Sequence, residues 1–288
     1  MSSPIVLVNP GSGPKETPVD DLTEAFGDLA EVRATTGQGL AVDVARAVDA
    51  GAPWVGVAGG DGSQRIAAPI LAAAQRPLLA VPCGTRNHFA KDLGLDTIEA
   101  AVLAAKAGDC TQEVDLAWVG HECFLNTCNL GMYTAIVKER VRQKGKLPKR
   151  VADGIGIVRE AVKGSRLRLV LDGRPVTTWA VFIGNSCYGD NVGSLGREAL
   201  DDGLLDVRIV LANQKVARLR LFGALLGGRL HRTPVMEQLS RPDLEVVTPG
   251  CSAMDVAVDG DVFRLRTPLR LRIDRHALTV LTAPPQTG

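Results

Sequence analysis

Apolar runs and amphipathic stretches alternate along the chain up to about residue 108. Continuous apolar runs predict buried strands, because a strand covered on both faces needs no polar alternation; they lie at 4–8, 54–58 and 77–81, and a shorter strand fits 31–35. Helical patterns follow at 18–29, 39–50, 63–74, from about 86, and at 97–107. Asp96-Thr97-Ile98-Glu99 predicts a capped helix start, and we expect Pro69 to distort its helix or to lie near its start. The alternation predicts a parallel sheet covered by helices.

The pattern changes near residue 113, where short strand-like segments predominate. They lie at 113–119, 122–128, 166–171, 176–184, 204–211, 243–248, 254–258, 262–265, 268–273 and 277–281. Asp172-Gly173 and Asp259-Gly260 are typical of tight hairpin turns, and helical patterns recur near 131–143, 150–163 and 215–227. We therefore expect an α/β domain at 1–112, to which residues 276–288 return, and a β-rich domain at 113–275.

Three loops rich in glycine and small polar residues leave the predicted strand ends of the first domain. They are NPGSG at 9–13, GGDGS at 59–63 and GTRNHFA at 84–90. Ligands of parallel sheets collect at the carboxyl ends of strands, and glycines let backbone amides approach a phosphate. Each loop also has an ordinary interpretation: a Pro-Gly turn at 9–13, Asp61 as a helix N-cap, and Thr85 or Asn87 as a cap of the next helix.

Asp61 is an unusual residue beside an anion site unless a cation accompanies it, and a Mg²⁺-nucleotide meets that requirement. The sequence contains neither G-x-x-x-x-G-K-[ST] nor G-x-G-x-x-G. A Walker P-loop and a nicotinamide fingerprint are therefore absent.

These three loops, in this order, resemble the diacylglycerol-kinase catalytic domain. LDDGLLD at 200–206 and VDGD at 258–261 extend the resemblance over nearly the whole chain. The superfamily includes bacterial lipid kinases, sphingosine kinases and, more distantly, NAD kinases. The resemblance implies a nucleotide-binding α/β domain, a β-sandwich-like second domain and an active site in the cleft between them. It also implies an ATP-dependent kinase that converts diacylglycerol to phosphatidic acid.

The resemblance further implies roles for individual residues. ATP would be held by Asn9, Pro10, Gly11, Ser12, Gly13, Thr35, Gly59, Gly60, Asp61, Gly62, Ser63, Gln64, Arg65, Thr85 and Asn87. A structural Mg²⁺ would be held by Asp202 with the carbonyls of Ala199 and Leu204. Asp259 would be the general base, and Asp261 takes the place of a neighbouring glutamate. Asp61 would organise the catalytic Mg²⁺.

Two positions depart from the family pattern. His88 stands where the family has an aspartate, and Asp261 is one methylene shorter than the usual glutamate. Both bear on a rival hypothesis, a non-catalytic nucleotide- or lipid-binding protein of the same fold. A second rival is a kinase for a soluble substrate such as NAD, which the GTRNHFA motif disfavours. Sphingoid bases and phosphatidylglycerol stay open as lipid substrates.

Composition fits an ordinary globular protein of 288 residues, with 45% hydrophobic and 23% charged residues. The net charge of +1 supplies no argument for nucleic-acid binding. The six cysteines include no CxxC pair, so we expect small core residues in a reducing compartment. His121, Cys123 and Cys128 match no standard zinc spacing.

The N-terminus lacks the basic region of a signal peptide, and no run of about 18 apolar residues occurs. We therefore expect a cytoplasmic protein that visits the inner face of the membrane to reach a lipid substrate. Residues 138–150 hold seven Lys or Arg and one Glu, and residues 215–232 mix Leu and Phe with Arg. A solvated loop and an ordinary packed helix are the alternatives for these segments, and a homodimer stays open.

Overall fold

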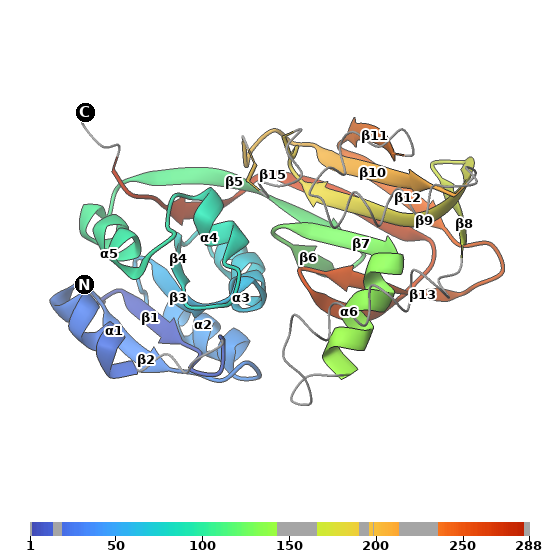
Figure 1. Cartoon of the computed structure of the whole chain (residues 1–288). Coiled ribbons are helices and arrows are strands. Elements are labelled where there is room, and N and C mark those ends of the chain that lie inside the picture. The colour runs from blue at the N-terminus through green and yellow to red at the C-terminus, as the bar shows by residue number, and fades with distance from the viewer. Residues whose placement is uncertain are drawn as a thin grey trace. The chain divides into compact units, whose positions relative to one another are not determined.

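The computed structural model describes residues 2–13, 19–142, 166–189, 196–197, 199–212 and 236–284. The chain divides into two compact units (Figure 1). Unit 1 comprises Met1–Leu116 with Asp274–Gly288, and unit 2 comprises Ala117–Ile273. The helices predicted at 150–163 and 215–227 lie outside the described residues, as does most of the basic segment 138–150.

Unit 1 is built on a parallel sheet, as the apolar runs predict. Its spatial order is β2-β1-β3-β4, and the end of β15 lies beside β4. The strands are β1 (Ile5–Val8), β2 (Glu31–Ala34), β3 (Val55–Gly59) and β4 (Leu78–Pro82). The helices are α1 (Val19–Phe26), α2 (Leu40–Asp49), α3 (Asp61–Ala73), α4 (His88–Asp92) and α5 (Ile98–Ala107), with a 3-10 turn η1 at Gly27–Leu29.

The chain order creates a switch point in this sheet. It passes from β1 to β2 on one side and then returns to β3 on the other side of β1. Because such crossovers are right-handed, α1 and α2 cover opposite faces, and α1 contacts α5 while α2 contacts α3. The carboxyl ends of β1 and β3 therefore flank the position at which open α/β sheets bind ligands.

Two local predictions for unit 1 have different outcomes. α5 has a capped start as expected, and Thr97 is the cap, because its hydroxyl accepts the N–H of Ala100 at 3.1 Å. Pro69, however, is the ninth residue of α3, which continues as an α-helix to Ala73. The expectation that Pro69 lies near the helix start was wrong, because α3 already begins at Asp61.

Unit 2 is an antiparallel β structure with one described helix, α6 (Met132–Arg142). Its strands follow the order β14-β13-β7-β9-β8-β12-β15, with β10 beside β9, β11 beside β10, and β6 beside β5. They are β5 (Thr111–Val119), β6 (Glu122–Phe124), β7 (Thr127–Gly131), β8 (Leu167–Leu171), β9 (Arg174–Asn185), β10 (Leu205–Leu211), β11 (Met236–Arg241), β12 (Asp243–Val247), β13 (Ala253–Val258), β14 (Asp261–Arg266) and β15 (Leu269–Leu281). β5 and β15 each run from one unit into the other.

Both predicted Asp-Gly hairpins are present. Asp172 and Gly173 have φ of 45° and 80°, and Asp259 and Gly260 have φ of 47° and 92°. Positive φ at both central residues is the mark of a type I′ turn, which matches the twist of the paired strands. β8 therefore joins β9, and β13 joins β14, without further loop residues.

The core of unit 2 has two apolar clusters. The larger one gathers inward-facing residues of β5 to β15, among them Phe124, Ile183 and Val256. The second packs Met132 and Ile136 of α6 against β9 and β10. α6 therefore covers one part of the sheet with its apolar side.

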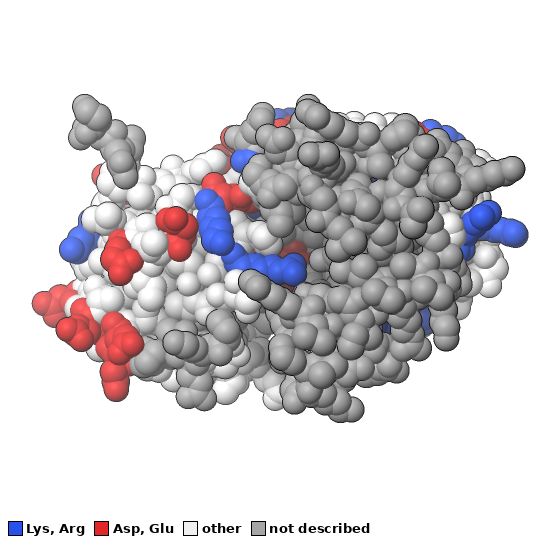
Figure 2. Space-filling view, viewed as in Figure 1, with Lys and Arg blue, Asp and Glu red and all other residues white. Residues whose placement is uncertain are grey.

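All six cysteines lie in the described part of the chain and are free thiols. Cys123 and Cys128 are buried, as predicted for core residues, whereas Cys251 is exposed because it follows the Pro-Gly turn after β12. No helix of the described residues has the length and hydropathy needed to cross a bilayer. On the face drawn in Figure 2, acidic side chains gather over α1, and the other described charges of both signs are dispersed.

Candidate active site

The loops after β1 and β3 are joined by small hydroxyl side chains. Asn9 Nδ2 donates to Ser63 Oγ at 3.3 Å, and the hydroxyls of Ser12 and Ser63 lie 3.3 Å apart. The N–H of Gly60 donates to Ser12 Oγ at 3.1 Å. A Cβ on Gly59 would lie 2.6 Å from Ser63 Oγ and 3.0 Å from Ser12 Oγ. The two loops therefore close on each other only because residue 59 has no side chain.

The loops after β3 and β4 meet at a second glycine contact. A Cβ built on Gly84 would lie 2.3 Å from Gly60 Cα. Asn87 holds this loop in shape, because its Oδ1 accepts the Gly84 N–H at 2.8 Å and its Nδ2 donates to the Gly84 carbonyl at 3.1 Å. Asn87 has φ of 53°, a left-handed conformation that asparagine tolerates better than most residues. Asn87 therefore shapes the loop through its side chain and does not cap α4 with it.

Asp61 links two helices. Gly60 is the N-cap of α3 and Asp61 its first residue, so the interpretation of Asp61 as the N-cap was wrong. Its Oδ1 instead accepts the N–H of Phe89 in the first turn of α4 at 3.0 Å. A glycine N-cap offers no side chain to the N–H groups of the first turn, which is a favourable setting for an anion.

The remaining predicted nucleotide ligands of unit 1 surround these loops. Pro10 and Gly11 are the central residues of the turn that the bond from Ser12 N–H to the Asn9 carbonyl closes, Gly13 follows it, and Gly62 lies in the first turn of α3. Thr35 is buried at the end of β2 and donates to Asp43 Oδ2 at 2.6 Å. Thr85 is exposed between β4 and α4.

Three further side chains change the polarity of this region. Gln64 is fully buried, and among the described residues neither of its amide atoms has a hydrogen-bond partner. Arg65, the fifth residue of α3, is also buried. Burial lowers the pKa of His88, with help from Arg86, against the opposing effect of Asp61. His88 is therefore neutral near pH 7, unlike the aspartate it replaces.

In unit 2, Asp259 is held firmly by a neighbouring loop. Its Oδ2 accepts the N–H of Leu125 at 2.7 Å, and its Oδ1 accepts those of Asn126 at 3.0 Å and Thr127 at 2.8 Å. Burial, with the negative charge of Asp259 nearby, raises the pKa of the Cys128 thiol. The hairpin turn predicted at Asp259-Gly260 is present together with this anchor. Asp261, the first residue of β14, is exposed.

Asp202 makes contacts typical of a backbone anchor. Its Oδ2 accepts the Cys187 N–H at 2.8 Å and its Oδ1 accepts the Leu204 N–H at 2.9 Å. The Leu204 carbonyl accepts the Ser186 N–H at 3.0 Å, and Ala199 lies nearby in sequence, half-buried. Within the described ranges, no group of three His, Cys, Asp or Glu side chains gathers as a metal site. The predicted site of one carboxylate and two backbone carbonyls is of a different kind, and its metal role stays a prediction.

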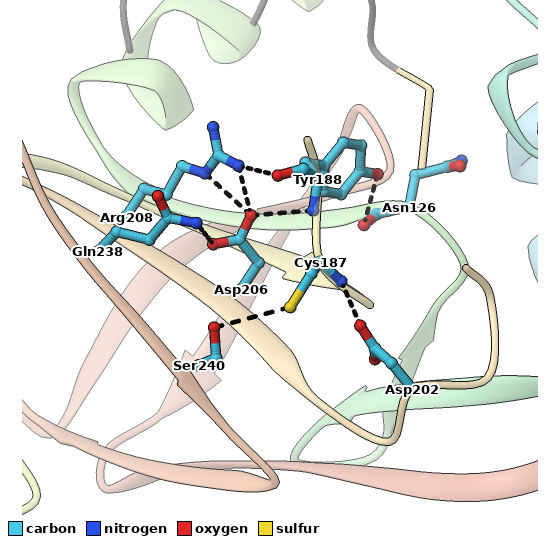
Figure 3. A network of polar contacts seen from close by, with 8 residues as sticks. All are labelled: Asn126, Cys187, Tyr188, Asp202, Asp206, Arg208, Gln238 and Ser240. Carbon is cyan, nitrogen blue, oxygen red and sulfur yellow. Dashed lines mark hydrogen bonds and ion pairs between the residues drawn. The ribbon is translucent and has the colours of Figure 1, made fainter. Parts of the chain in front are cut away.

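A polar network beside Asp202 was not predicted from the sequence (Figure 3). Asp206 is almost fully buried; its Oδ2 accepts from Arg208 Nε at 2.9 Å and from the Tyr188 N–H at 3.1 Å, and its Oδ1 accepts from Gln238 at 3.0 Å. The Tyr188 hydroxyl in turn donates to the Asn126 carbonyl at 3.1 Å. The spacing of Asp206 and Arg208 could have indicated the pair, because residues two apart in a strand share a face.

Comparison with known proteins agrees with this architecture. The model of the diacylglycerol kinase catalytic domain matches residues 3–119, and that of the YegS C-terminal NAD kinase beta sandwich-like domain matches residues 130–282. A Mycobacterium tuberculosis protein named diacylglycerol kinase is 29% identical over 253 residues, which cover 84% of this chain and 79% of the relative. A Pseudomonas putida protein named "probable lipid kinase YegS-like" is 33% identical over 220 residues, which cover 70% of this chain and 73% of the relative.

A solved structure described as a diacylglycerol kinase from Bacillus anthracis has the same fold, with a TM-score of 0.70 at 21% identity over 98% of this chain and 97% of that one. The predicted fold class, an α/β domain followed by a β-sandwich-like domain, is confirmed. The chain therefore belongs to the diacylglycerol kinase catalytic domain family, and its relatives include proteins named YegS-like lipid kinases.

Proposed function

We propose that this protein transfers the γ-phosphoryl group of ATP to the hydroxyl of a lipid, with diacylglycerol as the first candidate and phosphatidic acid as its product. Family membership supports a lipid kinase that uses a nucleotide. The observation that carries the proposal is the meeting of three glycine-containing loops at the switch point of the parallel sheet. Backbone amides at such a place bind phosphates, which is the main requirement of phosphoryl transfer.

In this proposal the loops at 9–13, 59–63 and 84–87 hold the phosphates of ATP. Arg65 is a buried cation near the start of α3 and is a candidate counter-charge. Mg²⁺ would be held near Asp61 and would neutralise charge on the phosphates. Because Asp61 accepts the Phe89 N–H, its carboxylate is immobilised between the second and third loops.

Asp259 is the proposed general base. Its carboxylate takes the proton of the lipid hydroxyl while that oxygen forms a bond to the γ-phosphorus, and the bond from this phosphorus to the bridging oxygen breaks to release ADP. Three amide hydrogen bonds keep the carboxylate in one orientation, which a positioned base requires. Asp261 lies two residues further along, at the start of β14, and is a second candidate for a catalytic carboxylate.

The test combines a lipid panel with one conservative variant. Diacylglycerol, a sphingoid base, phosphatidylglycerol and, separately, NAD are offered with labelled ATP and Mg²⁺. Asp61→Asn keeps an oxygen for the Phe89 N–H but removes the charge, so we expect turnover to fall at least about 100-fold while stability changes little. Asp172→Asn is the matched control, because Asp172 also accepts a backbone N–H, that of Glu245 at 2.8 Å, in a turn of unit 2.

Full turnover in a folded Asp61→Asn variant, or phosphorylation of NAD in preference to every lipid, would refute the assignment.

The lipid must be presented at a membrane surface, so we also propose peripheral contact with the inner leaflet. Of the basic segment 138–150, Lys138 forms an ion pair with Asp255. Binding to anionic vesicles that is insensitive to salt would exclude an electrostatic contribution of this segment.

A further inference from the structure

The loop that holds Asp259 is itself held from its opposite side. Its amides at 125–127 face Asp259, and the carbonyls of Leu125 and Asn126 accept hydrogen bonds from other residues of unit 2. The Leu125 carbonyl accepts from Arg197 Nη1 at 2.6 Å and from Asn185 Nδ2 at 3.2 Å. The Asn126 carbonyl accepts from the Asn185 N–H at 2.9 Å and from the Tyr188 hydroxyl at 3.1 Å. The loop is thus fixed between donors on one side and a carboxylate on the other.

One peptide group connects a cation to the carboxylate. The carbonyl of Leu125 and the N–H of Asn126 belong to the same peptide unit. The carbonyl accepts from Arg197, and the N–H donates to Asp259 Oδ1 at 3.0 Å. A positive charge at the oxygen polarises the peptide, so its N–H becomes a stronger donor to the negative carboxylate. The arrangement orders guanidinium, peptide and carboxylate in a single chain of hydrogen bonds.

Arg197 is built into unit 2 as a fixed cation. Its residue is 9% exposed, and the same Nη1 also donates to the Asn185 carbonyl at 2.9 Å. Nη2 donates to Asn126 Oδ1 at 3.3 Å, and the guanidinium lies 5.7 Å from the centre of the Tyr188 ring. A charge is buried in this way only when several groups satisfy it, and here these include carbonyls of the Asp259 loop.

We infer that Arg197 is a positioning residue for Asp259, acting through the peptide between Leu125 and Asn126. This rests on the proposed role of Asp259 as the base, but the structural coupling is measurable without any reaction. Tyr188 contributes a weaker link of the same kind, because the peptide whose carbonyl it binds carries the Thr127 N–H that donates to Asp259. Loss of the cation weakens the hold on the carboxylate and lets it rotate from its working orientation.

The first measurement is amide hydrogen exchange over residues 124–128 in Arg197→Met, Arg197→Lys and Tyr188→Phe. We expect the amides of residues 124–128 to exchange fastest in Arg197→Met and less fast in Tyr188→Phe. In Arg197→Lys we expect exchange close to that of the wild type, because lysine keeps the positive charge. The control is Thr178→Val, which removes a buried hydroxyl that lies 2.8 Å from the Ala180 carbonyl and 2.6 Å from the Val210 carbonyl elsewhere in unit 2. If Thr178→Val accelerates these amides as much as Arg197→Met does, the inference is overturned.

The second measurement is kinetic. For Arg197→Met we expect kcat to fall about 10- to 100-fold with KM for ATP within about twofold, and we expect the acidic limb of log kcat against pH to move to higher pH. Thr178→Val lowers stability without moving that limb. An unchanged limb in folded Arg197→Met overturns the positioning role. If exchange responds as expected but wild-type protein phosphorylates no lipid, the coupling stands and the proposed reaction is wrong.

Discussion

The contact between Gly60 and Gly84 offers a sharp test of the site geometry, because its two sides tolerate a methyl group differently. A Cβ on Gly84 would lie 2.3 Å from Gly60 Cα and 2.7 Å from Asn87 Oδ1, whereas a Cβ on Gly60 would lie 3.3 Å from Gly84 Cα. Neither glycine has the positive φ that would strain an alanine for other reasons. Gly84→Ala and Gly60→Ala therefore add the same group to the same contact with unequal steric cost.

The magnitude follows from the overlap. Ordinary contact begins at 3.4 Å, so Gly84→Ala must move two backbone segments apart by about 1 Å, and it also disturbs the bond from Gly84 N–H to Asn87. Overpacking of this kind costs about 1–3 kcal/mol, and we expect the upper half of that range. Gly60→Ala needs a shift of only a few tenths of an ångström, so we expect a cost below about 1 kcal/mol.

Urea unfolding of unit 1 measures both variants. The chain has three tryptophans, of which Trp54 is buried in unit 1 while Trp118 and Trp179 lie in unit 2. Replacing the latter two by phenylalanine makes Trp54 fluorescence a reporter of unit 1 alone. Equal destabilisation by the two substitutions, or no effect of Gly84→Ala, would refute the close approach of the loops. If these loops bind phosphates, Gly84→Ala also weakens ATP binding more than Gly60→Ala does.

Two further predictions concern buried polar groups. Gln64→Leu should raise the free energy of unfolding by about 1–3 kcal/mol, because it removes buried amide atoms that have no partner in the described structure. Gln238→Leu, the same substitution, should lower it by a similar amount, because it deprives the buried Asp206 carboxylate of a donor; urea titration of both variants checks the opposite signs. Burial lowers the pKa of His88 below 6.5, so the unfolded chain binds the proton first and stability falls as the pH drops below that value. His88→Gln should flatten this slope below pH 6.5, and an unchanged slope would contradict the burial of the imidazole.

Apolar runs predicted β1, β3 and β4 of unit 1 well because these strands are buried on both faces, whereas β2 is mostly exposed. β11 was missed because Met236–Arg241 alternates weakly and its residues are partly exposed. β15 was expected as two strands, since Arg275 and His276 interrupt the apolar alternation. It continues as one strand through His276, which has φ of 50° and whose N–H donates to Asp115 at 2.8 Å.

The most informative error lies at 122–128, which the sequence pattern predicts as one strand. The structure divides it into β6 and β7, with Leu125 and Asn126 between them. Their amides leave the strand ladder because they donate to Asp259, more than 130 residues further along the chain. Apolar periodicity describes burial and carries no information on a carboxylate that arrives from so distant a hairpin.

Several aspartates of this fold accept hydrogen bonds from backbone N–H groups of other elements. Asp61 accepts from Phe89, Asp202 from Cys187 and Asp259 from the loop at 125–127. An anchoring role and a catalytic role do not exclude each other, because a carboxylate fixed by amides is already oriented before substrate binds. The anchor does change how a loss of activity is interpreted. Asp259→Asn would turn an NH₂ group toward at least one N–H donor, so lost turnover implies a base only if exchange at 125–127 stays slow.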